Sequence, residues 1–365
     1  MLNIPTSTHT VSVSVIDPGV RLDLPASWFI EPEIKGHERL IVPAYSFLIT
    51  HPSGQKLLFD LSVRKDFENL APELASLLTD PSSPATLTAP HNVSDVLVEN
   101  GVRLDEINAI IWSHFHFDHA GDPSLFPAST DLIVGPGFTS SHAPGYPEKP
   151  DAPVLASDWK GRKLVEMDFT NHPNGQLSIG KFRAIDWFGD GSFYLLHTPG
   201  HSVDHMCGLA RVQEDSFILM GADSAHHPGE FRPTELNPIP AIVRPNPLPR
   251  NPRYASLCPG DIFETLGHEK DNTCTPFYRP GKRFTHDVDE CISSIEGLAG
   301  FDESEDVFVV IAHDHSLLPI FSGEEDGDQG WLFPKRSLDG WKEAGLKGRG
   351  MWRFLADFEE AVADV

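Results

Sequence analysis

The sequence predicts an α/β fold that carries its chemistry at one edge of its sheets. Four short apolar runs have the length and the β-branched or aromatic content of buried strands: 109–112, 193–196, 217–220 and 307–311. Each run is followed within a few residues by His or Asp, in the stretches SHFHFDH, HTPGH, GADSAHH and AHDH. Because α/β folds place functional loops at the ends of their strands, we expect these side chains to form one site.

The segments around these four strands have simpler patterns. Residues 11–15 alternate as a strand does, and 44–50 and 56–60 predict two strands joined by a His-Pro-Ser-Gly-Gln turn. Helical spacing predicts helices over 67–79, 94–100, 287–298 and 351–362. The second helix is expected to begin with Ser94 as its N-cap and to stop at Gly101.

A proline-rich segment follows the third of the four strands. Residues 228–259 contain nine prolines, too many for regular structure. We interpret 228–285 as an insertion over the site and 287–365 as helices with the last strand, all within one domain of residues 1–365. Aromatic residues of the insertion are expected to form a pocket wall: Phe231, Tyr254, Phe263, Phe277 and Tyr278. A dimer contact or an inert loop is the alternative for this insertion.

Composition excludes several classes of function. The 365 residues contain 28 Lys and Arg against 53 Asp and Glu, a formal charge of −25 that repels nucleic acid and anionic membrane surfaces. No run approaches the roughly 18–20 apolar residues of a membrane helix, and the N-terminus does not have the pattern of a signal peptide. The four cysteines form no CxxC motif. We therefore expect a cytoplasmic protein without nucleic-acid or membrane partners.

The strongest motif is His114-Phe-His116-Phe-Asp118-His119. In an extended segment, residues two apart face the same way, so His114 and His116 can hold one ion. Once the chain turns into a helix, Asp118 and His119 can face a neighbouring ion. Imidazole and carboxylate ligands favour Zn²⁺, with Mn²⁺, Fe²⁺ or Co²⁺ as alternatives. The motif therefore predicts a site for two divalent metal ions.

Together with three later motifs, this stretch resembles the metallo-β-lactamase superfamily. The later motifs are Thr198-Pro-Gly-His201, Gly221-Ala-Asp223 and Ala312-His313-Asp314, in that order. The resemblance covers about residues 40–318 and implies an αββα sandwich with a dinuclear site at the shared edge of two sheets. It implies three sets of ligands: His114, His116 and His201 for the first ion, Asp118, His119 and His313 for the second, and Asp223 as a bridge. His315 competes for the last place, and His226 or His227 are further candidates.

Within that superfamily, the chain resembles the lactonase branch, which includes N-acyl homoserine lactonases, and fungal lactam hydrolases. Asp223 stands where true β-lactamases have Cys or Ser, and His116 and Asp118 argue against the flavodiiron branch. Two departures from the lactonases stand out. Their tyrosine three residues after the bridging Asp is His226 here, and their Asp-Thr-Gly strand end is Asp60-Leu61-Ser62. The resemblance implies that Asp60 supports the ligands from behind.

The expected activity is that of a dinuclear metal-dependent hydrolase. It would open a cyclic ester by attack of a hydroxide that bridges the two ions. Asp118 would carry a proton to the leaving group, and His226 would donate a hydrogen bond to the developing oxyanion. The alternatives are a cyclic amide hydrolase (for a γ-lactam or a benzoxazolinone-type ring), a glyoxalase-like or thioesterase-like thioester hydrolase, and a sulfur dioxygenase with one iron. We expect a small, uncharged cyclic substrate; the sequence leaves a homodimer open.

Overall fold

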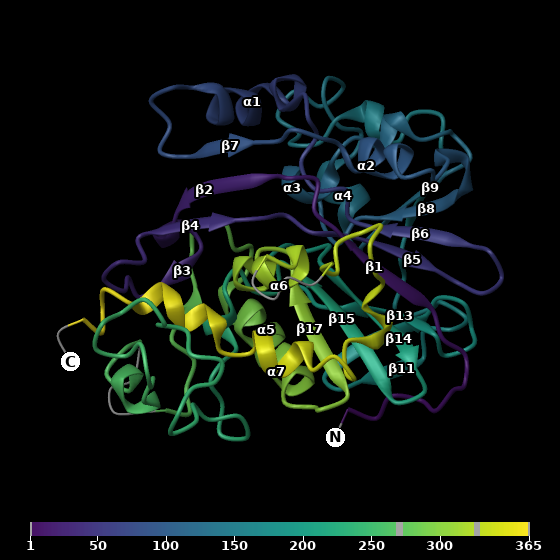
Figure 1. The fold of residues 1–365 in the computed structure, drawn as a ribbon. Helices are drawn as coiled ribbons and strands as arrows, with labels where there is room; N and C mark the ends of the chain where they lie inside the picture. Colours follow the sequence, from purple (N-terminus) through teal and green to yellow (C-terminus); the bar gives the residue numbers. More distant parts are fainter. Residues whose placement is uncertain (1, 268–272, 325–328, 364–365) are drawn as a thin grey trace.

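Two six-stranded sheets stack face to face at the centre of the fold (Figure 1). The computed structural model describes residues 2–267, 273–324 and 329–363; residues 268–272 of the predicted insertion and both ends of the predicted 1–365 domain lie outside them. In spatial order, the first sheet contains β1 (Ser12–Ile16), β5 (Ser46–Thr50), β6 (Lys56–Phe59), β8 (Ile107–Ile111), β9 (Asp131–Val134) and β10 (Leu164–Glu166). The second contains β11 (Leu177–Ile179), β12 (Phe182–Asp186), β13 (Phe193–His197), β14 (Met206–Gln213), β15 (Ser216–Ala222) and β17 (Val307–Ile311).

Helices cover the outer face of each sheet. Successive side chains of a strand point to opposite faces, so Phe308 and Val310 of β17 pack between the sheets while Val307 and Val309 face outward. The outward side chains pack against α5 (Val288–Asp302). On the other side, α2 (Val93–Glu99) and α4 (Phe138–His142) pack on the first sheet. These layers confirm the predicted αββα sandwich.

Three of the predicted helices differ in detail from the structure. The segment 67–79 breaks before Pro72, giving a 3-10 turn (Phe67–Asn69) and then α1 (Pro72–Thr79), because proline fits only the first turn of a helix. The N-cap of α2 is Asn92 rather than Ser94, and Asp95 completes its capping box. The tail forms a 3-10 helix, η10 (Arg353–Phe358), instead of an α-helix, and its apolar side chains pack into a core cluster.

A further layer of structure lies beside the sandwich. It contains a small sheet of β4 (Arg39–Val42), β2 (Arg21–Pro25) and β7 (Thr86–Thr88), and the short pair β3 (Ile30–Glu31) and β16 (Arg279–Pro280). One apolar cluster joins this layer to residues of the 228–285 segment and to the C-terminal tail, which run beside each other in Figure 1. Other short elements include α3 (Phe117–Ala120), η6 (Pro228–Glu230), η7 (Gly260–Phe263), α6 (Leu318–Ser322) and α7 (Leu346–Gly350).

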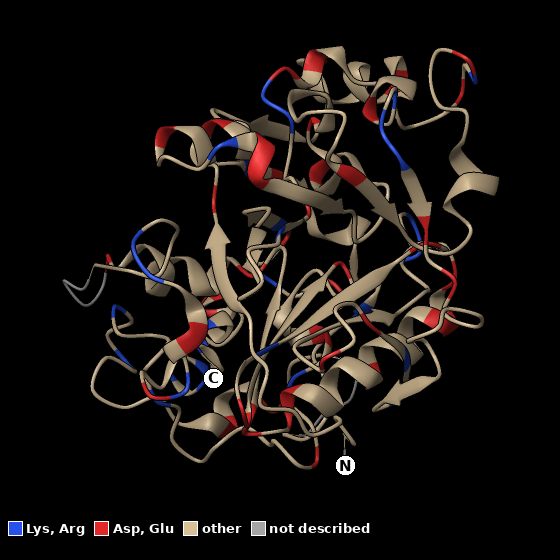
Figure 2. Cartoon of the chain, turned by 90° about the vertical axis from the view of Figure 1, so that its right-hand side faces the viewer, with Lys and Arg blue, Asp and Glu red and all other residues tan. Residues whose placement is uncertain are grey.

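Asp and Glu residues lie on loops and helices throughout the chain (Figure 2), consistent with the charge of −25. Among the helices of the described residues, none has the length and apolar character needed to cross a membrane.

Strand directions bring the ends of four strands to one edge of the sandwich. β13, β14 and β15 form antiparallel pairs, and β15 pairs parallel with β17, so β13, β15 and β17 all run the same way. The end of β8 joins this edge because the Met206 N–H donates to the Ser113 carbonyl at 2.8 Å. Each of these four strands is followed by His or Asp residues, which the fold therefore gathers in one place.

Candidate metal centre

The first group of side chains contains three imidazoles and a carboxylate. His114 and His116 follow β8, His201 follows β13, and Asp223 follows β15. His114 Nε2, His116 Nδ1 and His201 Nε2 lie 2.9–3.2 Å from one another. Asp223 Oδ2 lies 3.4 Å from His201 Nε2 and 3.7 Å from His114 Nε2. Four ligand atoms from three strand ends therefore converge on one point.

The spacing of these atoms suits a tetrahedral ion. Zn–N bonds of about 2.0–2.1 Å place the corners of a tetrahedron about 3.3 Å apart, and the measured separations span that length. Hydrogen bonds alone would not satisfy three mutually close imidazole nitrogens, because each ring N–H points in a single direction. A cation between them would satisfy all three.

The second group consists of Asp118, His119 and His313. Asp118 and His119 lie on the single-turn helix α3, and His313 follows β17. His313 Nε2 lies 3.4 Å from Asp118 Oδ2. Asp223 Oδ1 lies 3.0 Å from His119 Nε2 and 3.1 Å from His313 Nε2. Asp223 thus directs one oxygen to each group, which is the arrangement of a bridging carboxylate.

Hydrogen bonds behind the second group fix where the imidazole protons lie. His119 Nδ1–H donates to Asp60 Oδ2 at 2.9 Å, and His313 Nδ1–H donates to the Pro43 carbonyl at 2.7 Å. In the neutral rings, Nε2 of His119 and Nε2 of His313 are therefore unprotonated, and each directs its lone pair toward a carboxylate. His119 Nε2 and Asp223 Oδ1 are buried without a hydrogen-bond partner among the described residues. These residues therefore fit a metal ion, which would accept both lone pairs.

The carboxylates around the second group favour a positive charge there. Burial opposes the charged form of His313, but the Asp223 and Asp118 carboxylates outweigh it and raise its pKa to about 10. His119 shows the same balance, with its pKa raised well above the usual value by Asp223 and Asp60. Two carboxylates and two imidazoles packed in this way are stable only with a proton or a metal cation among them.

The other candidate histidines lie in different places. His226 directs Nε2 to within 3.3 Å of Asp223 Oδ2, and this nitrogen has no hydrogen-bond partner among the described residues. His315, the competitor for the last ligand place, instead directs Nε2 to Asp357 at 3.0 Å. His227 also bonds Asp357 at 3.0 Å. Of the three, only His226 reaches the candidate metal centre.

An apolar pocket of about 200 Å³ opens onto both groups. His116, Asp118 and Asp223 line it, and the other lining residues are Leu24, Trp28, Phe29, Leu74, Leu77, Leu78, Ala85, Phe115, Phe117, Pro153 and Phe284. The phenyl rings of Phe29 and Phe284 stack at 5.3 Å, and Phe29 lies 4.8 Å from the His226 ring. The pocket can therefore hold a small, flat, apolar ring against the ligand residues.

The predicted aromatic wall of this pocket is wrong in its residues. Tyr254, Phe263, Phe277 and Tyr278 pack in the cluster beside the sandwich, and Phe231 packs on the second sheet. Within the described part of the 228–285 segment, only Phe284 lines the pocket. The wall comes mainly from 24–29 and 74–85, which line the pocket together with residues 115–118 after β8.

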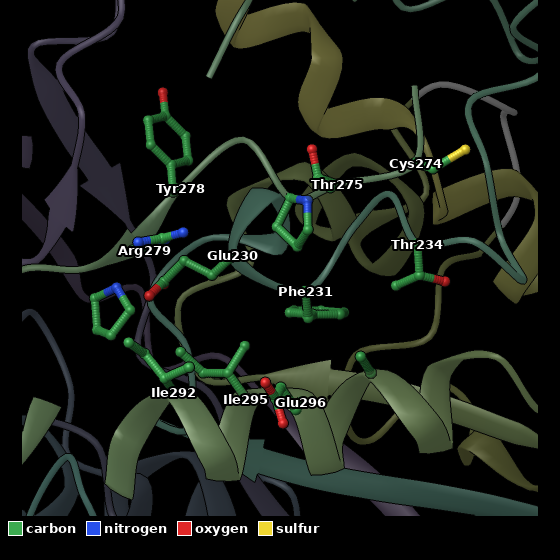
Figure 3. A pocket seen from close by; sticks show the side chains of 13 residues that line it. Glu230, Phe231, Thr234, Cys274, Thr275, Tyr278, Arg279, Ile292, Ile295 and Glu296 are labelled. Carbon is green, nitrogen blue, oxygen red and sulfur yellow. The ribbon is translucent and has the colours of Figure 1, made fainter. Parts of the chain in front are cut away.

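A second cavity of about 510 Å³ is separate from the metal centre. Figure 3 shows it between Phe231, near the start of the 228–285 segment, and Ile292 and Ile295 of α5. None of the seven predicted ligands lines it. Glu230 does line it, and its carboxylate accepts the backbone N–H groups of His226 and His227.

Sequence reasoning missed some residues that support the centre. His205 Nε2 accepts the backbone N–H of Asp223 at 3.1 Å, while its Nδ1–H donates to the Thr198 carbonyl at 3.0 Å. This buried histidine therefore holds the backbone of Asp223, whose carboxylate is shared by the two groups. Its place four residues after His201 was an available signal. The Pro43 carbonyl, which holds His313, leaves no signal in the sequence.

Comparison with known proteins gives a consistent picture. Residues 41–221 match the profile of the Metallo-beta-lactamase superfamily. The gamma-lactamase FDB1 of Fusarium pseudograminearum is 41% identical, over 99% of this chain and 86% of that protein. The metallo-hydrolase mfmC of Annulohypoxylon moriforme is also 41% identical, over 99% of this chain and 91% of that protein.

A solved structure shares the fold. It is an N-acyl homoserine lactone hydrolase with the product N-hexanoyl-L-homoserine bound at its catalytic metal center, and it is 18% identical to this chain. The TM-score is 0.50, and the match covers 89% of this chain and 98% of that one. At this identity, the likeness extends to the fold alone.

Proposed function

The chain belongs to the metallo-β-lactamase superfamily, and from this premise we propose that it is a dinuclear metal-dependent hydrolase of small, uncharged lactone or lactam rings. The observation that carries the proposal is the position of Asp223, whose two oxygens face two separate groups of ligand atoms. His114, His116 and His201 would hold the first ion. Asp118, His119 and His313 would hold the second, and zinc is the ion that this donor set favours.

Two divalent ions, when bound, supply a hydroxide at neutral pH and polarise the carbonyl to be attacked. The chain's own residues supply the remaining steps. Asp118 lines the pocket, and although burial raises its pKa, His313 and His119 bring the pKa below the usual value. Its carboxylate is therefore ionised at neutral pH, and it can take a proton and deliver it to the leaving oxygen or nitrogen.

His226 takes the place that tyrosine has in the lactonases that the sequence resembles. Its buried Nε2 has no hydrogen-bond partner among the described residues and lies beside Asp223. With a proton on Nε2, it would donate a hydrogen bond to the carbonyl oxygen of the ring as negative charge develops there. Phe29 packs on the same imidazole and lines the pocket, so it would hold the ring close to His226.

The pocket supports the substrate class. Its wall is aromatic and aliphatic apart from the candidate ligands, so a charged substituent would lose its hydration there without gaining a partner. A volume of about 200 Å³ suits one small ring system better than a long acyl chain. The 41% identity to a gamma-lactamase over 99% of the chain favours the lactam within this class.

Metal content and a substrate panel test the proposal together. We expect two zinc equivalents per chain by elemental analysis, with turnover of a fused aromatic lactam or a γ-lactone and none of a thioester. Asp223→Ala should lose both metals and all activity, with His116→Ala as a second variant. Asp186→Asn is the matched control, because Asp186 accepts two backbone N–H groups in a loop after β12. One iron with oxygen consumption, or full activity in both ligand variants, would overturn the proposal.

A further inference from the structure

A third group of side chains outside the metal centre looks at first like another metal site. His37, His227 and Asp357 place ligand atoms within 4.8 Å of one another. The Gly229 N–H donates to His227 Nδ1 at 3.0 Å, so the proton of this imidazole lies on Nε2. That Nε2–H donates to Asp357 Oδ2 at 3.0 Å. His227 therefore has no lone pair to offer an ion, and the group is a hydrogen-bond network.

The network joins two turns that carry residues of the metal centre. Asp357 Oδ2 holds His227, the neighbour of His226. Asp357 Oδ1 holds His315 Nε2 at 3.0 Å, two residues after His313. One carboxylate on the C-terminal tail thus connects the turn after β15 to the turn after β17.

Packing around this carboxylate makes the connection stiff. The ring of Phe354 lies 5.3 Å from the His227 ring, and that of Phe358 lies 6.1 Å from it. Arg353 Nε donates to the Ser316 carbonyl at 3.0 Å, a second link from η10 to the turn after β17. The Asp357 side chain is only 17% exposed, so little water competes for its two hydrogen bonds.

We propose that Asp357 is a positioning residue that holds His226 and His313 at their places in the metal centre, an inference that rests on the proposed function. An asparagine at this position has one acceptor oxygen for two imidazole N–H donors. His227 cannot change its tautomer to compensate, because the Gly229 N–H occupies Nδ1. His315 can keep the other hydrogen bond only by moving its proton to Nδ1, which is buried without a hydrogen-bond partner among the described residues, so the exchange buries an unsatisfied N–H. Asp357→Asn therefore weakens the hold on the turn after β17 while leaving every proposed ligand in the chain.

The first test is zinc affinity, measured on metal-free protein by competition with a chromophoric chelator. Asp357→Asn should weaken one of the two zinc equivalents about tenfold, the size of effect seen when support behind metal ligands is lost. His315→Ala breaks only one of the two bonds and should act in the same direction, and it replaces Asp357→Asn if that variant does not fold. The matched control is Asp339→Asn, whose Oδ1 accepts the Val13 N–H away from both turns. Equal affinities in all variants would overturn the proposal.

The second test is a kinetic double-mutant cycle. Saturated with zinc, Asp357→Asn should lower kcat about tenfold with KM changed less than twofold, whereas Asp339→Asn leaves both unchanged. In the His226→Ala background, Asp357→Asn should have a smaller effect on kcat, because part of its action passes through His226. Independent effects in the cycle would overturn the link to His226. If the wild-type chain binds two zinc ions but opens no ring, the proposed function fails while the zinc test still decides the role of Asp357.

Discussion

Replacing Asp60 by asparagine should weaken one metal site and spare the other. Asp60 follows β6 and is 1% exposed. Its Oδ2 accepts His119 Nδ1–H at 2.9 Å, and its Oδ1 accepts the Ser113 N–H at 2.7 Å. If the asparagine oxygen keeps the hydrogen bond from the Ser113 N–H, the NH₂ group of the asparagine faces His119 Nδ1. His119 must then accept at Nδ1 and carry its proton on Nε2, the atom proposed to hold the second ion.

The size of the effect can be estimated in two ways. A hydrogen bond that involves a charged group contributes about 1.5–3 kcal/mol, which is about 10-fold to 160-fold in an equilibrium constant. Loss of the group behind a metal-ligating histidine typically costs about 10-fold to 100-fold in metal affinity. Both estimates predict that Asp60→Asn binds the second zinc equivalent at least about tenfold more weakly than the wild type does. The first equivalent should change little, because His114, His116 and His201 do not contact Asp60.

Chelator competition resolves the two equivalents of metal-free protein. Asp186→Asn is the control, because it also removes a carboxylate that accepts two backbone N–H groups but touches no histidine of the centre. A folded Asp60→Asn chain that binds both equivalents as tightly as the wild type would refute the assignment of the His119 proton. Equal weakening of both equivalents would refute the division of the ligands into two groups.

Three further predictions concern stability, each measured by urea unfolding. Ser62→Gly should stabilise the fold by about 1 kcal/mol, because Ser62 has φ 57° and a buried hydroxyl without a hydrogen-bond partner among the described residues; a loss of stability would contradict this. Gly200→Ala should lower the free energy of unfolding by about 3–5 kcal/mol, since its Cβ would lie 2.2 Å from the Cys291 nitrogen. The control Gly54→Ala also has positive φ but open space around it, and should lower that free energy by about 1–2 kcal/mol. Equal losses in the two variants would disprove the clash. Burial raises the pKa of Asp158 to about 7, although the Leu155 N–H lowers it. The folded state then keeps a proton that the unfolded chain releases above about pH 4, so stability falls between pH 4 and 7; Asp158→Asn should flatten that fall, and an unchanged slope would count against the shifted pKa.

The candidate centre was predictable because its residues are specified locally. His114 to His119 form one short motif, and the other ligands come within a few residues of strands that can be recognised by their apolar runs. Once strand directions place those ends at one edge, few arrangements remain. The structure brings His313 to the centre and turns His315 toward Asp357, a choice that spacing alone left open.

The pocket wall was not predictable because the sequence does not show which part of the fold an apolar side chain packs against. Tyr254 and Phe277 stand in the segment that seemed suited to the site, yet they pack against the C-terminal tail. Trp28 and Phe29 precede the first predicted hairpin and line the pocket. Which aromatic residues meet a ligand depends on how distant segments pack, and hydrophobic burial does not discriminate among partners.

The division between ligand residues and pocket wall bears on how far relatives can guide the choice of substrate. Five of the seven proposed ligands lie within the matched stretch 41–221, while Asp223 lies two residues past its end and His313 lies well beyond it. The apolar pocket residues outside the stretch are Leu24, Trp28, Phe29 and Phe284. Arg283 stacks on the Trp28 ring at 4.2 Å, and Phe284 lies 5.6 Å from the same ring. Two segments far apart in the sequence, around Trp28 and around Phe284, therefore close one side of the pocket together. Because that side would face the proposed ring and not the proposed ions, substitutions there should change the preferred ring without changing the chemistry.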